Sequence, residues 1–306
     1  MSATQAPERP ARADPRRLIR DVLAISRPRF WIASAVMMEI GFVLATHRVV
    51  PRGAEIAELA LACLVTGPLL WLAVLAVNDA HDLPTDRRNP RKAGAPLVAG
   101  RMTPRGALAV AAAASALTVA ASLPLGPFFA LGTACVVLLG WAYSAPPVRL
   151  KGRPGADLAA NAVIGVLGPL GGWTAVSGTP EGFPWPIAVI GVMAAAALYL
   201  PTTSADRDAD EGAGIPTVAV ALGRRATFEL GFALWTGSAV LALVFALADE
   251  VIDASLVPLH LVAAPVLLVL YRCLLKDRPT FPAITVVACA YLVPCIGFVV
   301  TYVDSI

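Results

Sequence analysis

The chain alternates between long apolar stretches and short polar links. A helix that crosses the hydrocarbon core of a bilayer needs roughly 20 mostly apolar residues. Backbone polar groups in lipid must form hydrogen bonds within the protein, so helices are the expected form of apolar stretches this long. The pattern predicts an all-α, multi-pass membrane bundle of nine transmembrane helices. The nine stretches cover residues 30–46, 58–78, 105–122, 126–145, 157–177, 184–204, 226–247, 255–275 and 281–302.

The segment before the first apolar stretch has a different character. Residues 1–29 carry seven arginines and a short amphipathic piece around Leu18 and Leu23. No apolar core followed by a small-residue cleavage site occurs there, so we do not expect a signal peptide. We therefore divide the chain into a cytoplasmic basic tail with an interfacial helix, residues 1–29, and a nine-helix domain, residues 30–306. Within that domain the short link 122–126 predicts a tight hairpin between the third and fourth spans.

Composition agrees with a membrane protein. Apolar residues make up 58% of the chain and charged residues only 15%, and the mean hydropathy is +0.72. Ordinary globular chains have roughly 45–50% and 25%. The net charge of +3 is too small to indicate a nucleic-acid partner. All five cysteines lie inside apolar stretches without metal-ligand spacing, so we expect them to pack as small apolar side chains.

The distribution of positive charge predicts the orientation in the membrane. With the nine spans as drawn, 22 of the 24 Lys and Arg residues fall on one side, and only Arg48 and Arg52 fall on the other. Segments rich in Lys and Arg stay in the cytoplasm. We expect a cell-membrane protein with a cytoplasmic N-terminus and an external C-terminus.

Two acidic clusters follow apolar stretches on that same cytoplasmic side. Asn78, Asp82 and Asp86 are spaced four residues apart, and Asp206 and Asp210 repeat the spacing. Helical positions four apart drift by only about 40° and share a face. Orientation depends on Lys and Arg and hardly on acids, so topology alone does not explain these clusters. Pro84 lies inside the first cluster, and we expect it to break the helix or mark its fraying end.

Carboxylates from two helices form a hard-oxygen site of the kind that holds Mg²⁺ together with substrate phosphates. Neighbouring basic side chains would complete the coordination of the phosphates. The alternative is that the basic residues are solvated charges that only set topology, and we favour it for some of them. The candidates for phosphate binding are Arg87, Arg88, Arg149, Lys151 and Arg207, and the solvated reading is favoured for Arg88, Arg91, Lys92 and Arg153.

At these residues the sequence resembles the UbiA superfamily of intramembrane prenyltransferases. That family carries N-x-x-x-D-x-x-x-D after the second span and D-x-x-x-D after the sixth. Both motifs are present here, at 78–86 and 206–210, and the second is followed by the similar segment 214–223. The loop 143–151 resembles the family's Y-S-x-P-P-x-R-x-K, and 26–31 resembles the start of its first span. The four motifs occur in the family's order across nearly the whole chain.

The resemblance implies nine helices around a lipid-open central cavity that is capped on the cytoplasmic side. It also implies Mg²⁺ as cofactor, with a prenyl diphosphate and a hydrophobic small-molecule acceptor as partners. An apolar cavity would shield the allylic carbocation from water. By this resemblance Asn78, Asp82, Asp86, Asp206 and Asp210 are the catalytic metal ligands, and Tyr143, Ser144, Arg149 and Lys151 assist the departure of the diphosphate.

Other polar residues near the motifs have less certain roles. Asp79, His81 and Asp208 are either partners of the ligands or solvent-facing charges, and we favour the second reading for His81. Glu39 lies in the middle of the first span, where an ionisable group is costly, and it either touches substrate or forms a structural hydrogen bond. Asp157 is expected to cap a helix start, whereas Asn161 either lines the cavity or caps. We keep Glu39 and Asn161 as candidate substrate-binding residues.

Three functions compete. The leading one is transfer of an isoprenyl group from an allylic diphosphate to an aromatic or polyene acceptor. The second is a UbiA-type terpene cyclase, which shares the ionisation step but needs no acceptor. The third, a secondary transporter, normally places ion ligands near the bilayer midplane, whereas these clusters lie at one membrane end. Donor chain length and acceptor identity do not follow from the sequence.

Overall fold

The chain folds as a helical bundle. The computed structural model describes residues 15–304, and no strand occurs in that range. Of the basic tail and interfacial helix expected at residues 1–29, residues 1–14 lie outside the described residues. The helix expected before the first span is α1, Pro15–Ser26. It packs against α4 through the fully buried Ile25 and is tied to the neighbouring link by an ion pair from Arg101 to Asp21 at 2.9 Å.

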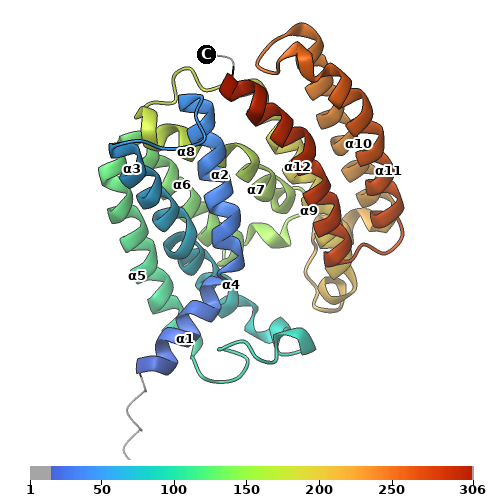
Figure 1. The fold of residues 1–306 in the computed structure, drawn as a ribbon. Coiled ribbons are helices and arrows are strands. Elements are labelled where there is room, and N and C mark those ends of the chain that lie inside the picture. The colour runs from blue at the N-terminus through green and yellow to red at the C-terminus, as the bar shows by residue number, and fades with distance from the viewer. Residues whose placement is uncertain (1–14, 305–306) are drawn as a thin grey trace, which may run out of the picture.

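Nine helical segments of residues 15–304 are long and apolar enough to cross a membrane, as the sequence predicts. Figure 1 shows α1 and the C-terminus at opposite ends of the bundle, as an odd number of spans requires. The spans are α2 Arg29–Thr46, α3 Ala54–Leu64 continued by η1 Val65–Leu69 and α4 Leu70–Asp86, α5 Pro104–Ser122 with η3 Leu123–Leu125, α6 Pro127–Ser144, α7 Ala156–Ala162 with α8 Ile164–Ser177, α9 Trp185–Gly212, α10 Val218–Ala248, η5 Ala254–Leu256 with α11 Val257–Leu275, and α12 Phe281–Asp304.

Several helices continue beyond the apolar stretches that predict them. α4 ends at Asp86 and α9 at Gly212, rather than at residues 78 and 204. Hydropathy detects only the part of a helix that needs an apolar solvent, whereas backbone hydrogen bonding continues into the polar interface. Both acidic clusters therefore lie on regular helical turns. Pro84 falls in the last turn of α4, which fits the expectation that it marks the helix end.

Two spans contain local breaks. The second span includes the π-helical turn η1 around Pro68, whose ring removes a backbone donor and cannot fit a regular α-helical turn. The fifth span divides at Val163 into α7 and α8. The third and fourth spans are joined through η3 and Gly126, whose φ of 94° permits the expected tight hairpin.

Glycines bring the central helices into backbone contact. A methyl group on Gly41 would overlap the backbone of Pro169, so α2 and α8 lie directly against each other. Gly165 and Gly191 face each other in the same way across α8 and α9. Small residues at such crossings allow the close van der Waals packing that holds membrane helices together. The crossings connect the N-terminal helices to α9, which carries the second acidic cluster.

Candidate functional site

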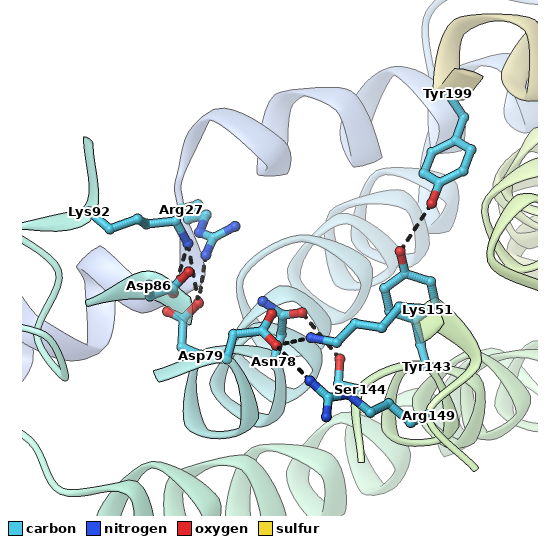
Figure 2. Close-up of polar contacts among 11 residues, drawn as sticks. Arg27, Asn78, Asp79, Asp86, Lys92, Tyr143, Ser144, Arg149, Lys151 and Tyr199 are labelled. Carbon is cyan, nitrogen blue, oxygen red and sulfur yellow. Dashed lines mark hydrogen bonds and ion pairs between the residues drawn. The ribbon is translucent and has the colours of Figure 1, made fainter. Parts of the chain in front are cut away.

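The last two turns of α4 begin the site. Asn78 and Asp82 lie one turn apart on this helix, near the point where α6 ends. Ser144, the last residue of α6, donates a hydrogen bond of 3.3 Å to the Asn78 side-chain oxygen (Figure 2). Ser144 is 1% exposed, so this contact is shielded from solvent. The contact joins the first acidic motif to the segment 143–151.

Lys151 is the central cation of the site. It lies in the short η4 helix, Leu150–Gly152, and donates to Asp82. Arg149 approaches the same carboxylate at 3.9 Å. Lys151 is only 7% exposed, and this burial lowers its pKa to about 8, while the negative charges of Asp210 and Asp79 oppose the shift. Lys151 therefore interacts with acids of both motifs, from α4 and from α9.

Asp86 has a different partner from Asp82. It pairs with Lys92 at 3.1 Å, and Lys92 also lies 4.0 Å from Asp79. Arg27 donates to Asp79 at 2.6 Å (Figure 2). At about 100° per residue, Asp79 and Asp86 are only about 20° apart around α4, whereas two steps of four residues carry Asp86 about 80° away from Asn78. The first motif is thus divided between two groups of cations.

The second motif lies on the last two turns of α9. The charge of Asp206 acts on Asp210, and the charge of Asp210 reaches Lys151 and Tyr143. Asp208, between them, is exposed and pairs with Arg224 at 2.6 Å. Lys151 therefore contacts Asp82 of α4 and lies within range of the charge of Asp210 of α9.

A pair of tyrosines lies on the membrane side of these charges. The hydroxyl groups of Tyr143 and Tyr199 are 3.3 Å apart and join α6 to α9 (Figure 2). Sequence reasoning selected Tyr143 and missed Tyr199. Tyr199 precedes Asp206 by seven residues, which places it on the same face of α9, two turns further into the membrane. That spacing was the signal available in the sequence.

Asn161 and Asp157 connect helix ends near this pair. Asn161 donates to the Asp157 backbone oxygen at 2.9 Å, and its side chain also interacts with the Tyr143 hydroxyl. Asp157 is fully buried and accepts from the backbone N–H of Leu158 at 2.8 Å and of Val218 at 2.8 Å. The expected capping role of Asp157 thus extends to the start of α10.

The remaining candidates lie apart from this group. Glu39 is half-buried on α2 and its charge acts on Cys63 of α3; within residues 15–304 no hydrogen bond or ion pair joins it to the site. Arg207 pairs with Glu211 at 3.2 Å on α9 itself. Arg87, Arg88 and Arg153 are exposed. Lys92 was expected to be a solvated charge, but it pairs with Asp86 and Asp79, because the α4 helix turns both acids toward it. The side chain of Arg91 lies outside the described part.

The donor set fits magnesium in chemistry, because it consists of carboxylate and amide oxygens. In the described range, however, no three His, Cys, Asp or Glu side chains converge closely enough to hold a metal ion by themselves. Mg²⁺ usually keeps several waters and takes one or two carboxylates together with substrate phosphates. The arrangement therefore fits an ion that shares its coordination with a bound diphosphate, better than a protein-only metal site.

Known proteins resemble this chain in sequence and in fold. The chain is 31% identical over 236 residues to a lycopene elongase/hydratase of Halobacterium salinarum, covering 76% of this chain and 81% of that protein. It is 29% identical over 174 residues to a protoheme IX farnesyltransferase of Alcanivorax borkumensis, covering 56% and 55%. A UbiA homologue from Archaeoglobus fulgidus, solved with DMAPP and Mg²⁺, superposes with a TM-score of 0.74 at 20% identity over 94% of this chain and all of that one.

A family model covers most of the chain. The model described as the UbiA prenyltransferase family matches residues 34–283, which include every span from the first to the start of the ninth. The acidic motifs of α4 and α9 and the loop between α6 and α7 all fall inside this range. The chain belongs to the UbiA prenyltransferase family and is a membrane-spanning, prenyl-transferring enzyme.

Proposed function

We propose that this enzyme transfers an isoprenyl group from an allylic prenyl diphosphate to a carbon of a polyene acceptor, with Mg²⁺. The observation that carries the proposal is the position of Lys151. This buried cation contacts Asp82 of α4, and the charge of Asp210 of α9 acts on it. A diphosphate placed there would meet both acidic helix ends and the basic loop. The names of relatives that are about 30% identical, the lycopene elongase/hydratases, favour a polyene over an aromatic acceptor.

The residues would act in the following way. Asn78, Asp82, Asp86, Asp206 and Asp210 would hold Mg²⁺ through the diphosphate, and the ion would supply a Lewis acid that neutralises the leaving group. Lys151 and Arg149 donate to the diphosphate as negative charge accumulates on it, which favours cleavage of the carbon–oxygen bond. Ser144 keeps the Asn78 amide oriented by their hydrogen bond. The apolar faces of α6 and α9 would keep water away from the allylic cation until a double bond of the acceptor attacks it, and loss of a proton from the resulting cation to the released diphosphate or to water would then complete the transfer.

The test measures diphosphate release and product formation by the protein in lipid nanodiscs. Dimethylallyl diphosphate, Mg²⁺ and lycopene are supplied together, and the donor is also supplied alone. We expect prenylated polyene and diphosphate from the wild type, loss of both with Asp82→Ala and Asp206→Ala, and near wild-type turnover with Asp208→Ala, which is the matched control on α9. Chelation of Mg²⁺ should stop turnover and its readdition should restore it.

Two results would overturn this assignment. If both Asp82→Ala and Asp206→Ala keep wild-type turnover, the two acidic helix ends take no part in the reaction. A cyclic terpene formed from the donor alone, with no prenylated acceptor in the complete mixture, would identify a cyclase instead.

We further propose that the site faces the cytoplasm of the cell membrane. The support is the distribution of Lys and Arg, of which only Arg48 and Arg52 lie in links at the opposite end. A reporter enzyme that is active only outside the cytoplasmic membrane should be active when fused after residue 306 and inactive when fused after Gly94. The reverse pattern would contradict the orientation without touching the reaction.

A further inference from the structure

A cavity of about 420 Å³ lies beside the acidic site, at the end of the bundle. Three segments that are distant in sequence enclose it: the last turns of α4, the loop after α6, and the link from α9 to α10. Its contacts from α4 include His81, and the loop contributes Arg149 and Arg153. The third wall is the short segment 213–216. The cavity is thus assembled from the same three segments that carry the site, and of the candidate site residues only Arg149 belongs to its described lining.

The side chains that line this cavity are basic or neutral. His81, Arg149 and Arg153 contribute nitrogen donors, and no Asp or Glu belongs to the described lining. The positive charges of Lys151 and Arg149 also act on His81, so its surroundings are cationic. Arg153 donates a hydrogen bond of 3.2 Å to the Pro147 backbone oxygen and remains exposed to solvent. This bond holds its side chain at the edge of the cavity. A cavity with this lining selects anions.

Arg149 connects the cavity to the acidic site. Its guanidinium group lies 3.9 Å from Asp82 and is 40% exposed, and the same residue lines the cavity. Lys151, two residues further on, is 7% exposed and does not belong to the cavity lining. Arg149 has a φ of 40°, a left-handed conformation that L-residues rarely adopt. Both cations approach Asp82, but only Arg149 also lines the cavity.

We propose that this cavity is a binding site for inorganic diphosphate, which it receives from the acidic site after the carbon–oxygen bond has broken. The proposal rests on the function proposed above, because that reaction releases one diphosphate per turnover next to Arg149. The leaving group then carries its full negative charge and has lost its apolar chain, so a cationic, water-accessible cavity retains it better than a site lined with acids. His81 donates an N–H in either protonation state, and Arg153 offers a planar pair of donors.

The acidic site and the cavity differ in their need for metal, and the experiment uses that difference. Acids bind diphosphate only through Mg²⁺, whereas a cationic cavity binds it directly. Binding of radiolabelled inorganic diphosphate is measured in nanodiscs of zwitterionic lipid with excess chelator. We expect metal-independent binding that weakens about tenfold in Arg153→Gln and in His81→Asn and is retained in Arg225→Gln, an exposed arginine at the base of α10.

A second variant leaves the cations in place. Ile215→Asp adds a negative charge to the cavity wall and should weaken metal-independent binding at least as much as either neutral substitution. Thermal melting of each variant checks that the bundle is folded. In the turnover assay, inhibition by added diphosphate should require about tenfold more of it for Arg153→Gln than for the wild type.

The possible outcomes separate the two proposals. Absence of metal-independent binding, or equal binding by all variants, overturns the cavity assignment while leaving turnover untouched. If nanodiscs that contain phosphatidylglycerol abolish diphosphate binding at unchanged ionic strength, the cavity holds a lipid headgroup and the assignment is overturned as well. If the wild type binds diphosphate in this way but releases none from any prenyl diphosphate, the proposed function fails and the anion site stands.

Discussion

The acidic ends of α4 and α9 carry the same four-residue spacing but have different surroundings. On α4, Asp79 is buried and Asp82 is largely buried, and each contacts a basic side chain from another segment. Beside the α9 motif, Asp208 pairs with Arg207 of the same helix and with Arg224 of α10, and Glu211 pairs with Arg207, all at the exposed surface. The α4 acids thus help to hold the tertiary structure, whereas the ion pairs beside the α9 motif are exposed and contribute little to stability. Substitutions on α4 should therefore affect stability and activity together, and substitutions on α9 mainly activity.

The largest expected effect is on α9. Asp210→Asn should lower the rate of diphosphate release by roughly a hundredfold or more, because several kcal/mol of charge stabilisation corresponds to two or three powers of ten in rate. Its thermal midpoint should stay near that of the wild type. The rate is measured by coupled phosphate detection, and Glu211→Gln, one residue away and exposed, serves as the control. A stability loss equal to that of α4 variants would remove the contrast between the two helices.

Lys151→Met tests the contact between the two regions. It should lower turnover by about a hundredfold, as expected when a preorganised donor is removed from a charge-developing site. It should also lower the free energy of unfolding by roughly 1–3 kcal/mol, because Asp82, 17% exposed, loses its closest cation. Lys151→Arg keeps the charge and should recover most of the stability. Denaturant titration in detergent measures the stability, and an unchanged midpoint for Lys151→Met would show that the pair has no structural role.

Asp79→Asn tests how much an acid of α4 contributes to the stability of the fold. The Arg27–Asp79 pair is 2.6 Å long and largely buried, and it ties the residue that follows α1 to α4. Its loss should lower the free energy of unfolding by roughly 1–3 kcal/mol, with turnover reduced only severalfold. Proteolysis at the N-terminal side of α2 should become faster. A loss of turnover as large as that of Asp210→Asn, without a change in stability, would place Asp79 among the reacting groups.

Tyr199→Phe should have the smallest effect. It removes one hydroxyl of the bridge between α6 and α9 and keeps the ring, so the expected loss of stability is about 0.5–1.5 kcal/mol. Tyr302→Phe, which loses a hydrogen bond of 3.1 Å to Leu44 at the other end of the bundle, is the matched control. Differential scanning fluorimetry compares them. A much larger loss of turnover for Tyr199→Phe than for the control would give its hydroxyl a role in the reaction.

The sequence predicts the membrane bundle well and the site in part. Nine apolar stretches, each of spanning length, leave little choice of architecture, and the four-residue spacing correctly indicates that Asn78 and Asp82 share a face. Two steps of four residues turn Asp86 toward the side of Asp79, so its ion-pair partner is Lys92 and not Lys151. Ion-pair partners such as Arg27 and Lys92 depend on where links fold, and neither hydropathy nor spacing carries that information. Glu39 is an ionisable residue in the middle of a predicted span, which made it a candidate for substrate binding. Its charge acts on Cys63 of α3 and not on a residue of the site.

The carboxylate of Asp157 on α7 links that helix to Val218 at the start of α10, 61 residues further along the chain. Asp157 accepts a hydrogen bond from the first backbone N–H of α10, and this bond is buried. The segment 213–217 is therefore held against α7 and cannot move away without breaking the bond. The opposite wall, the loop 145–153, is held to α4 by the Lys151–Asp82 pair, and the hydrogen bond from Arg153 to Pro147 closes the loop on itself. One wall of the cavity is therefore held by a buried backbone contact, and the other by charged side chains that a bound anion would also attract.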